Sequence, residues 1–255
     1  MNPEVFVDDA IACAMYDEQK QYLNMHRNRF IYTLRELSNC FPVDRFLEIG
    51  SSGFFLRLVK EACPRAEVIG TQYADEVGFK EEAVPFRGWG NCGFYLGNPE
   101  RFPYTINSAS FDLVLCAEVI EHMAVDPMAL LAEINRILIF GGKVVITTPN
   151  IVSSRSIFAA LEHRMPFNFF AFNKNRSTDR HNIEYSPWLL KNIVEMAGFS
   201  VENMTTVNAW SMPDPKVDEI YSKFGFDSKL RGDNIIMVAV KNSDVIQRYP
   251  ESIYI

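Results

Sequence analysis

The sequence predicts an α/β fold with a doubly wound, mostly parallel sheet, an antiparallel edge strand and N-terminal helices. Strand and helix patterns alternate between residues 44 and 150, which is typical of parallel strands joined by helices on both faces of a sheet. The last two strand candidates, 200–207 and 233–241, have no clear long helix between them, so we expect antiparallel pairing at one edge. With 255 residues, 48% of them hydrophobic, the chain can bury one sizeable core.

Helical periodicity dominates the first part of the chain. Apolar residues recur along 9–39, where Tyr16, Leu23, Phe30 and Leu37 are seven residues apart. We therefore expect one or two amphipathic helices that cover one side of the sheet. The elements expected after them are a strand at 45–50, a helix at 54–62, strands at 67–71, 92–96 and 111–117, a helix at 126–140 and a strand at 143–148.

Two helices have clear start and stop signals. Asp126 can cap a helix whose first position suits Pro127, and a glycine pair at 141–142 follows it. A second capped helix runs from Ser186 to Ala197, directly before Gly198. These patterns divide the chain into a helical segment (1–43), a main domain (44–241) with an aromatic-rich insertion at 151–180, and a C-terminal tail (242–255).

Composition and charge exclude several classes of protein. A net charge of −7 argues against a protein that binds nucleic acid through its phosphate backbone. The longest apolar runs, such as 143–148 and 235–240, are far shorter than the roughly 20 residues that span a bilayer. Acidic residues interrupt the start of the chain, which argues against a secretory signal and makes the cytoplasm the expected compartment. Five scattered cysteines without a C-x-x-C pair are expected as small buried residues.

A turn of small residues follows the first predicted strand. Phe46 to Gly50 run into Ser51, Ser52 and Gly53, and a helix pattern begins immediately afterwards. In open α/β sheets ligands bind at the carboxyl ends of the strands, where such a turn lies. The turn lacks the G-x-G-x-x-G spacing that binds a pyrophosphate, which argues against a nicotinamide-dependent enzyme.

Four segments in this order resemble the class I S-adenosylmethionine-dependent methyltransferases. They are residues 47–53 (LEIGSSG), 97–104 (GNPERFPY), 111–123 (FDLVLCAEVIEHM) and 133–150 (EINRILIFGGKVVITTPN). The resemblance covers about residues 44 to 150, and the helix and strands up to about 241 fit the same topology. It implies a Rossmann-like fold and S-adenosyl-L-methionine as cofactor. The end of the chain, residues 232–234 and 248–254, is also similar to bacterial methyltransferases of polysaccharide and sugar modification.

The resemblance implies a set of cofactor-binding residues. Gly50 to Gly53 would line the methionine and ribose parts, and Gln72, which ends the second strand, would hold the ribose hydroxyls. The family usually has an acidic residue at Gln72 and an aspartate at Asn98, but an amide oxygen still accepts hydrogen bonds. The full expected set is Glu48, Gly50, Ser51, Ser52, Gly53, Gln72, Tyr73, Asn98, Pro99 and Ala117.

A second group of residues offers metal ligands. Glu118, Glu121 and His122 are spaced to meet on one side of a helical turn at the end of the fourth strand of the family topology, and His181 could supply a fourth ligand. The pattern resembles the E-x-x-E-H metal site of plant-type small-RNA 2′-O-methyltransferases and ubiquinone-pathway O-methyltransferases. Such ligands suit Mg²⁺, Mn²⁺ or Zn²⁺. Without a metal, His122 or His181 is the candidate catalytic base, and a purely structural role for these residues stays open.

The insertion holds further candidates for substrate contacts. The aromatic run 167–172 could form a lid over the substrate, although packing in the core or in a homodimer explains it as well. Lys174, Arg176 and Arg180 could meet an anionic acceptor. We expect an O-methyltransferase acting on a sugar, nucleotide sugar or other small polyhydroxylated acceptor. RNA 2′-O-methylation, N- or C-methylation and a non-catalytic scaffold remain the alternatives.

Overall fold

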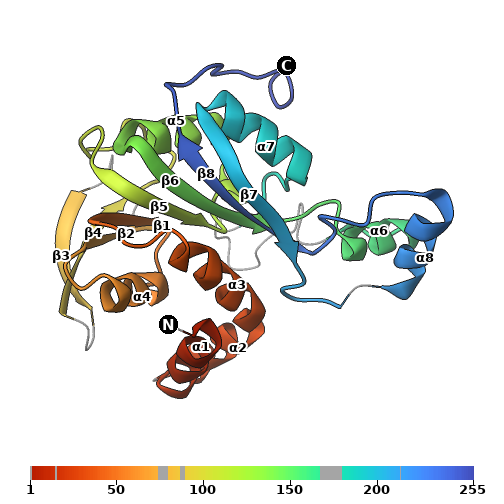
Figure 1. Ribbon diagram of the computed structural model, residues 1–255, viewed down its shortest axis with the longest axis horizontal. Coiled ribbons are helices and arrows are strands. Elements are labelled where there is room, and N and C mark those ends of the chain that lie inside the picture. Colours follow the sequence, from red (N-terminus) through yellow and green to blue (C-terminus); the bar gives the residue numbers. More distant parts are fainter. Residues whose placement is uncertain (1, 15, 74–79, 87–89, 167–179, 213) are drawn as a thin grey trace.

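An eight-stranded sheet forms the centre of the molecule in the computed structural model, which describes residues 2–14, 16–73, 80–86, 90–166, 180–212 and 214–255 (Figure 1). The strands lie in the order β3-β4-β2-β1-β5-β6-β8-β7. Their bounds are β1 Arg45–Ile49, β2 Glu67–Tyr73, β3 Lys80–Phe86, β4 Gly90–Gly97, β5 Phe111–Ala117, β6 Leu138–Pro149, β7 Phe199–Val207 and β8 Asn234–Lys241.

The five central strands run parallel, and the ends of the sheet are antiparallel. β4, β2, β1, β5 and β6 pair in parallel, whereas β8 pairs antiparallel with both β6 and β7. At the opposite edge β3 pairs antiparallel with β4. The structure confirms the predicted fold class, including the antiparallel pairing of the last two strands.

Helices cover both faces of this sheet. Their bounds are α1 Pro3–Ala12, α2 Asp17–Met25, α3 Arg27–Ser38, α4 Phe54–Ala62, α5 Pro127–Ile137, α6 Ser154–Leu161, α7 Pro187–Met196 and α8 Pro215–Phe224, with a 3-10 turn, η1, at Ile120–His122. α3 and α4 lie on one face and α5 and α7 on the other, while α6 and α8 lie together beyond the carboxyl end of β6 (Figure 1).

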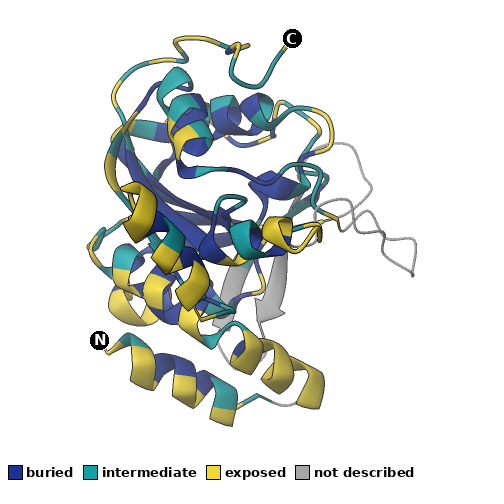
Figure 2. Cartoon of the chain, turned by 90° about the vertical axis from the view of Figure 1, so that its right-hand side faces the viewer, coloured by how far each residue is buried: buried dark blue, intermediate teal, exposed yellow. Residues whose placement is uncertain are grey.

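Alternating side chains of the strands form two separate cores. Leu47 and Ile49 of β1 pack with α5 and α7, whereas Phe46 packs on the opposite face with α3 and α4. This alternation follows from the two-residue period of a strand. Buried residues are concentrated along the strands and on the helix sides that face them (Figure 2).

Four helices begin with the same pair of residues, a capping side chain followed by proline. Asn2, Asp126, Ser186 and Asp214 each accept a hydrogen bond from a backbone N–H of the first turn, and the next residue is proline in every case. The cap satisfies a free N–H, and proline has none to lose. α8 therefore carries the signal that predicts α5 and α7, although no clear long helix was expected between β7 and β8.

Several predicted boundaries are wrong. The helix expected at 126–140 ends at Ile137, because Leu138 is extended and pairs with Phe111, so β6 starts there and contains the glycine pair. The stretch after Pro149 was expected to be irregular, but Ser153 caps α6. β3 was also missed. The N-terminal segment has three helices, and the first begins at Pro3 rather than near Asp9.

The structure agrees with only some of the remaining expectations. Among the cysteines with a described environment, Cys63 and Cys116 are buried, whereas Cys13 is exposed. The aromatic run 167–172, Lys174 and Arg176 lie outside the described residues. The tail 242–255 is held to the main domain through Asp126, which pairs with Arg248 and Tyr254. Within the described ranges, none of the helices has both the length and the apolar character that a membrane crossing requires.

Candidate functional site

The turn after β1 is held by a chain of short hydrogen bonds. The Ser51 hydroxyl donates to Oε2 of Glu48 at 2.6 Å and accepts from the backbone N–H of Gly53 at 2.9 Å. Thr71 of β2 fixes the other side, because its hydroxyl accepts from the N–H of Gly50 and its carbonyl from that of Ser51. Glu48 and Ser51 are thus buried supports of the turn, whereas Gly50 and Ser52 are exposed.

Gly50 lies where two loops approach closely. Its φ of +72° is in the left-handed region, and a Cβ atom there would stand 2.7 Å from Cγ2 of Val119. Any larger residue at this position would strain the backbone and push the turn away from the loop after β5. The backbone conformation and the close approach of the neighbouring loop therefore already require glycine at this position.

The remaining expected cofactor residues lie at the same edge of the sheet. Gln72 and Tyr73 end β2 and pair in register with Leu96 and Gly97 of β4, so Asn98 and Pro99 follow directly beside them. Ala117 ends β5, the neighbour of β1. Because these strands are parallel, their carboxyl ends meet beside the Gly50 turn. The structure therefore brings the ten expected cofactor-binding residues to one edge.

Glu118 lies outside the group of metal-ligating side chains. Its φ of +55° precedes the η1 turn, and its Oε1 accepts hydrogen bonds from Thr147 at 2.7 Å and from Nδ2 of Asn234 at 2.8 Å. The guanidinium of Arg29, from α3, lies 3.9 Å away. Glu118 thus joins three elements, α3, β6 and β8, to the end of β5.

Three of the four expected metal ligands come together. Glu121, His122 and His181 each offer one ligand atom, and these atoms lie within 4.8 Å of one another. Nε2 of His122 is 3.9 Å from Oε1 of Glu121. Backbone N–H groups of Asn182 and Ile183 donate to the carbonyl of Glu121, which holds the segment with His181 against the η1 turn.

The hydrogen bonds at Nδ1 of the two imidazoles indicate which nitrogen carries the proton. Nδ1 of His122 lies 3.0 Å from the carbonyl of Arg180, and because a carbonyl only accepts, Nδ1 carries the proton. Nδ1 of His181 lies 2.8 Å from Oε1 of Glu184, a buried carboxylate that acts as the acceptor in the same way. In a neutral ring with its proton on Nδ1, Nε2 is the nitrogen that can bind a metal or accept a proton.

Two carboxylate oxygens in this group are buried and have no hydrogen-bond partner. They are Oε1 of Glu121 and Oε2 of Glu184. Burial raises the pKa of Glu121 well above its usual range, and the nearby charge of Glu118 raises it further. A cation beside Oε1 would satisfy that oxygen and favour the ionised carboxylate. The donor set of one carboxylate and two imidazoles therefore fits a divalent metal.

Two residues of the site, Arg29 and Glu184, were not predicted from the sequence. Arg29 is a buried cation of α3 that lowers the pKa of Glu48 and Glu121, although burial still raises the pKa of Glu48 to about 8. Glu184 orients His181. Its position three residues after a candidate ligand histidine was a usable signal, since metal-binding histidines commonly donate their second nitrogen to a carboxylate. No local pattern linked Arg29 to a turn 19 or more residues later.

Comparisons with known proteins support the fold and match part of the chain to one domain family. Residues 47–146 match the family model described as a methyltransferase domain. No curated protein sequence gives a significant match. The match lies on the segment from β1 to β6, which carries the Gly50 turn and the Glu121 cluster, apart from His181.

Solved structures share the fold at low sequence identity. A S-adenosylmethionine-dependent methyltransferase from Thermotoga maritima, with histamine N-methylation as its suggested activity, is 19% identical, with 93% of this chain and 97% of that chain covered and a TM-score of 0.54. A Haloferax volcanii methyltransferase in complex with the Trm112 activator is 17% identical, with coverage of 94% and 97% and a TM-score of 0.56. One from Archaeoglobus fulgidus is 20% identical, with coverage of 82% and 92% and a TM-score of 0.54. At these identities the structures show that the chain shares their fold, and the domain match covers the part of that fold from β1 to β6.

Proposed function

We propose that this enzyme methylates a hydroxyl group of a sugar, nucleotide sugar or other small polyhydroxylated acceptor, assisted by Mg²⁺ or Mn²⁺. One observation carries the proposal, the convergence of ligand atoms from Glu121, His122 and His181 beside a buried oxygen of Glu121 that has no hydrogen-bond partner. A hydroxyl is the acceptor that needs this help most, because it must lose a proton as it is methylated.

The cofactor is assigned to the edge formed by the Gly50 turn, Gln72, Asn98 and Ala117. Methyl transfer from a sulfonium is an in-line displacement with an electrophile that is already activated. The protein must therefore align the acceptor and remove its proton. The cluster begins four residues after Ala117, at the end of the strand beside β1, which supports a position for it next to the cofactor in this proposal.

The chain's own residues have distinct roles in this proposal. Glu121, His122 and His181 would hold the cation, which lowers the pKa of a hydroxyl bound to it. The Arg180 carbonyl and Glu184 fix the two imidazole rings so that Nε2 faces the cluster. Glu118 stays with Arg29, Thr147 and Asn234 and supports the backbone beside the cluster.

A screen of acceptors tests the proposal. Formation of S-adenosylhomocysteine is measured with neutral sugars, acidic sugars and nucleotide sugars, with Mn²⁺ and after extensive chelation. We expect turnover on a hydroxylated acceptor that chelation suppresses and Mn²⁺ restores. Glu121→Gln and His181→Gln should lose this metal response, and His163→Asn is the matched control at an exposed left-handed position outside the cluster.

Each other outcome of the screen contradicts a defined part of the proposal. Turnover that survives chelation in metal-free protein rejects the cation and leaves His122 or His181 as a simple base. Methylation of amines alone rejects the hydroxyl acceptor. Calorimetry that detects no binding of S-adenosylmethionine or S-adenosylhomocysteine at millimolar concentration rejects the cofactor site and favours a scaffold.

A further inference from the structure

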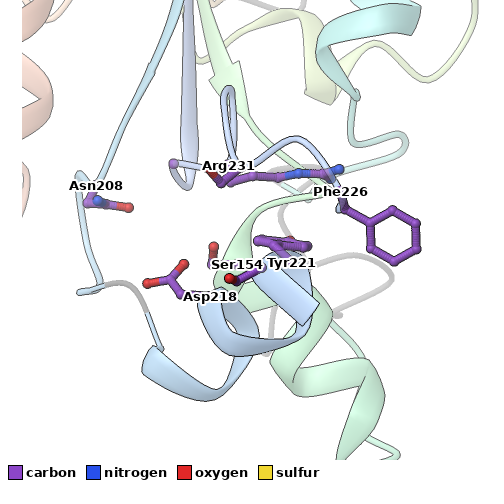
Figure 3. A pocket seen from close by; sticks show the side chains of 9 residues that line it. Ser154, Asn208, Asp218, Tyr221, Phe226 and Arg231 are labelled. Atoms are coloured by element: carbon purple, nitrogen blue, oxygen red, sulfur yellow. The ribbon is translucent and has the colours of Figure 1, made fainter. Parts of the chain in front are cut away.

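A polar cavity of about 540 Å³ lies between α6, α8 and the loop before β8, and none of the residues that line it belongs to the Glu121 cluster (Figure 3). Ser154 from the start of α6, Asp218 and Tyr221 from α8, Asn208 from the end of β7 and Arg231 from the loop before β8 contribute to its wall. The volume is in the range of pockets that bind small molecules.

Arg231 gives the cavity a fixed positive charge. Its Nη1 donates to the carbonyl of Val152 at 3.0 Å and its Nε to that of Asp227 at 3.3 Å, and its guanidinium carbon lies 5.0 Å from the centre of the Tyr221 ring. Throughout the part of the chain that the structure describes, no carboxylate forms an ion pair with it. The guanidinium is thus held in place by neutral groups, and its remaining N–H groups can serve an anionic ligand.

The rest of the wall suits hydroxyl groups. Asp218 and Asn208 lie on the opposite side of the cavity from the guanidinium, and Ser154 lies between them and Tyr221 (Figure 3). Carboxylate, amide and hydroxyl oxygens accept hydrogen bonds from hydroxyls, and the amide and serine also donate. The face of Tyr221 adds apolar surface. A polyhydroxylated ring that carries one negative charge matches all of these groups.

Hydrogen bonds of residues 150–151 link the loop that carries Arg231 to the segment that carries His181. The side-chain amide of Asn150 donates to the carbonyls of Leu230 at 3.0 Å and Gly232 at 2.8 Å, on either side of Arg231. The backbone of residues 150–151 pairs with Tyr185, the residue after Glu184. Asn150 therefore ties the wall with Arg231 and the segment with His181 to the end of the same strand, β6.

We propose that this cavity binds the acidic part of the acceptor, a sugar that carries a carboxylate or a phosphate group, with Arg231 as the residue that selects the charge. This inference rests on the proposed function, because it names the class of acceptor within it. It assigns a role to α6 and α8, which otherwise contribute nothing to the cofactor edge or to the cluster.

Ligand binding without cofactor or metal tests the subsite. Saturation-transfer NMR and calorimetry compare glucuronate, glucose 6-phosphate and glucose on the full chain. We expect at least one acidic sugar to bind more tightly than glucose, and Arg231→Gln to weaken that binding by roughly tenfold or more. Lys229→Gln is the matched control, because it removes an exposed cation from the same loop. Preference for the uronate or for the phosphate identifies which anion the site uses.

A second variant distinguishes a loss of binding from a loss of folding. Ser228 is exposed at the rim of the cavity, so Ser228→Trp should fill it without disturbing the core and should also abolish binding. Equal binding of glucose and both acidic sugars would overturn the subsite, as would undiminished binding in both variants. These binding measurements need no methyl transfer, so their outcome is independent of the acceptor screen. The subsite can be rejected while the screen still finds methylation of neutral sugars, and it can be supported while the screen finds no methylation.

Discussion

Nδ1 of His181 lies 2.8 Å from Oε1 of Glu184, whose side chain is fully shielded from solvent. A carboxylate in this position fixes both the ring orientation and the tautomer of the imidazole, and it makes Nε2 a stronger electron-pair donor. Oε2 of Glu184 has no hydrogen-bond partner, so within the described residues the hydrogen bond of this carboxylate is the one with His181.

Replacement of Glu184 should weaken metal binding. Glu184→Gln removes the charge, and its amide N–H₂ can turn toward Nδ1 and force the proton onto Nε2. We expect Mn²⁺ affinity to fall by about 10- to 100-fold in calorimetry. S-adenosylhomocysteine affinity should stay unchanged, and Glu195→Gln, on the following helix α7, should leave both affinities unchanged. Wild-type Mn²⁺ affinity in Glu184→Gln would show that the contact is structural only.

A carboxylate at the end of β2 should improve cofactor binding. In the proposed cofactor site, Gln72→Glu would put a carboxylate beside the ribose hydroxyls, and charge-assisted hydrogen bonds are stronger than neutral ones. S-adenosylhomocysteine should bind as well as in the wild type or more tightly, by up to about 1.5 kcal/mol. Gln247→Glu, in the tail, controls for the added charge. A large loss of affinity in calorimetry would place a different ligand group at Gln72.

The buried carboxyl of Glu48 should make stability fall as pH rises. Burial raises its pKa in the folded state to about 8, whereas it ionises near pH 4.5 when unfolded. Between these values the folded state holds one proton more, so this group contributes a loss of about 1 kcal/mol per pH unit in the free energy of unfolding. Glu48→Gln keeps an acceptor for Ser51 and should flatten this slope in denaturant unfolding from pH 5 to 8. A slope equal to that of the wild type would contradict the raised pKa.

Loss of Arg29 should destabilise the fold. Arg29→Met leaves Glu118 without its buried cation, and breaking a buried ion pair costs about 3 kcal/mol. Arg35→Met, on the same helix, breaks an exposed pair with Glu4 and should cost less than about 1 kcal/mol. Similar losses in the two variants, measured by urea unfolding, would show that Arg29 is no more than a surface cation.

The parallel core could be predicted because its strands have long apolar patterns bounded by clear turns. The start of α8 was also encoded, in Asp214 and Pro215, but the short and mostly exposed helix gave a weak apolar pattern. The end of α5 was not encoded locally, because Leu138 to Phe140 suit a helix and a strand equally. Their pairing with β5 decides the outcome.

The spacing of the motif predicted that its three side chains share one helical face, and the structure does not show this arrangement. Glu118, Glu121 and His122 share a face only if residues 118–122 form one helical turn. The structure instead has a left-handed residue at Glu118 before the η1 turn, which separates its carboxylate from the other two. Thr147, Asn234 and Arg29, which hold Glu118, come from distant parts of the chain. Such tertiary contacts could not be read from the motif.

The ligands of a bound cation show whether Glu121, His122 and His181 form a metal site. Pulsed electron paramagnetic resonance of Mn²⁺ added to the protein, with S-adenosylhomocysteine present, detects the nitrogen nuclei bonded to the metal. We expect couplings from two imidazole nitrogens, one of which disappears in His181→Gln while S-adenosylhomocysteine still binds. A spectrum of fully hydrated Mn²⁺, identical in the wild type and in His181→Gln, would rule out a metal site at these residues.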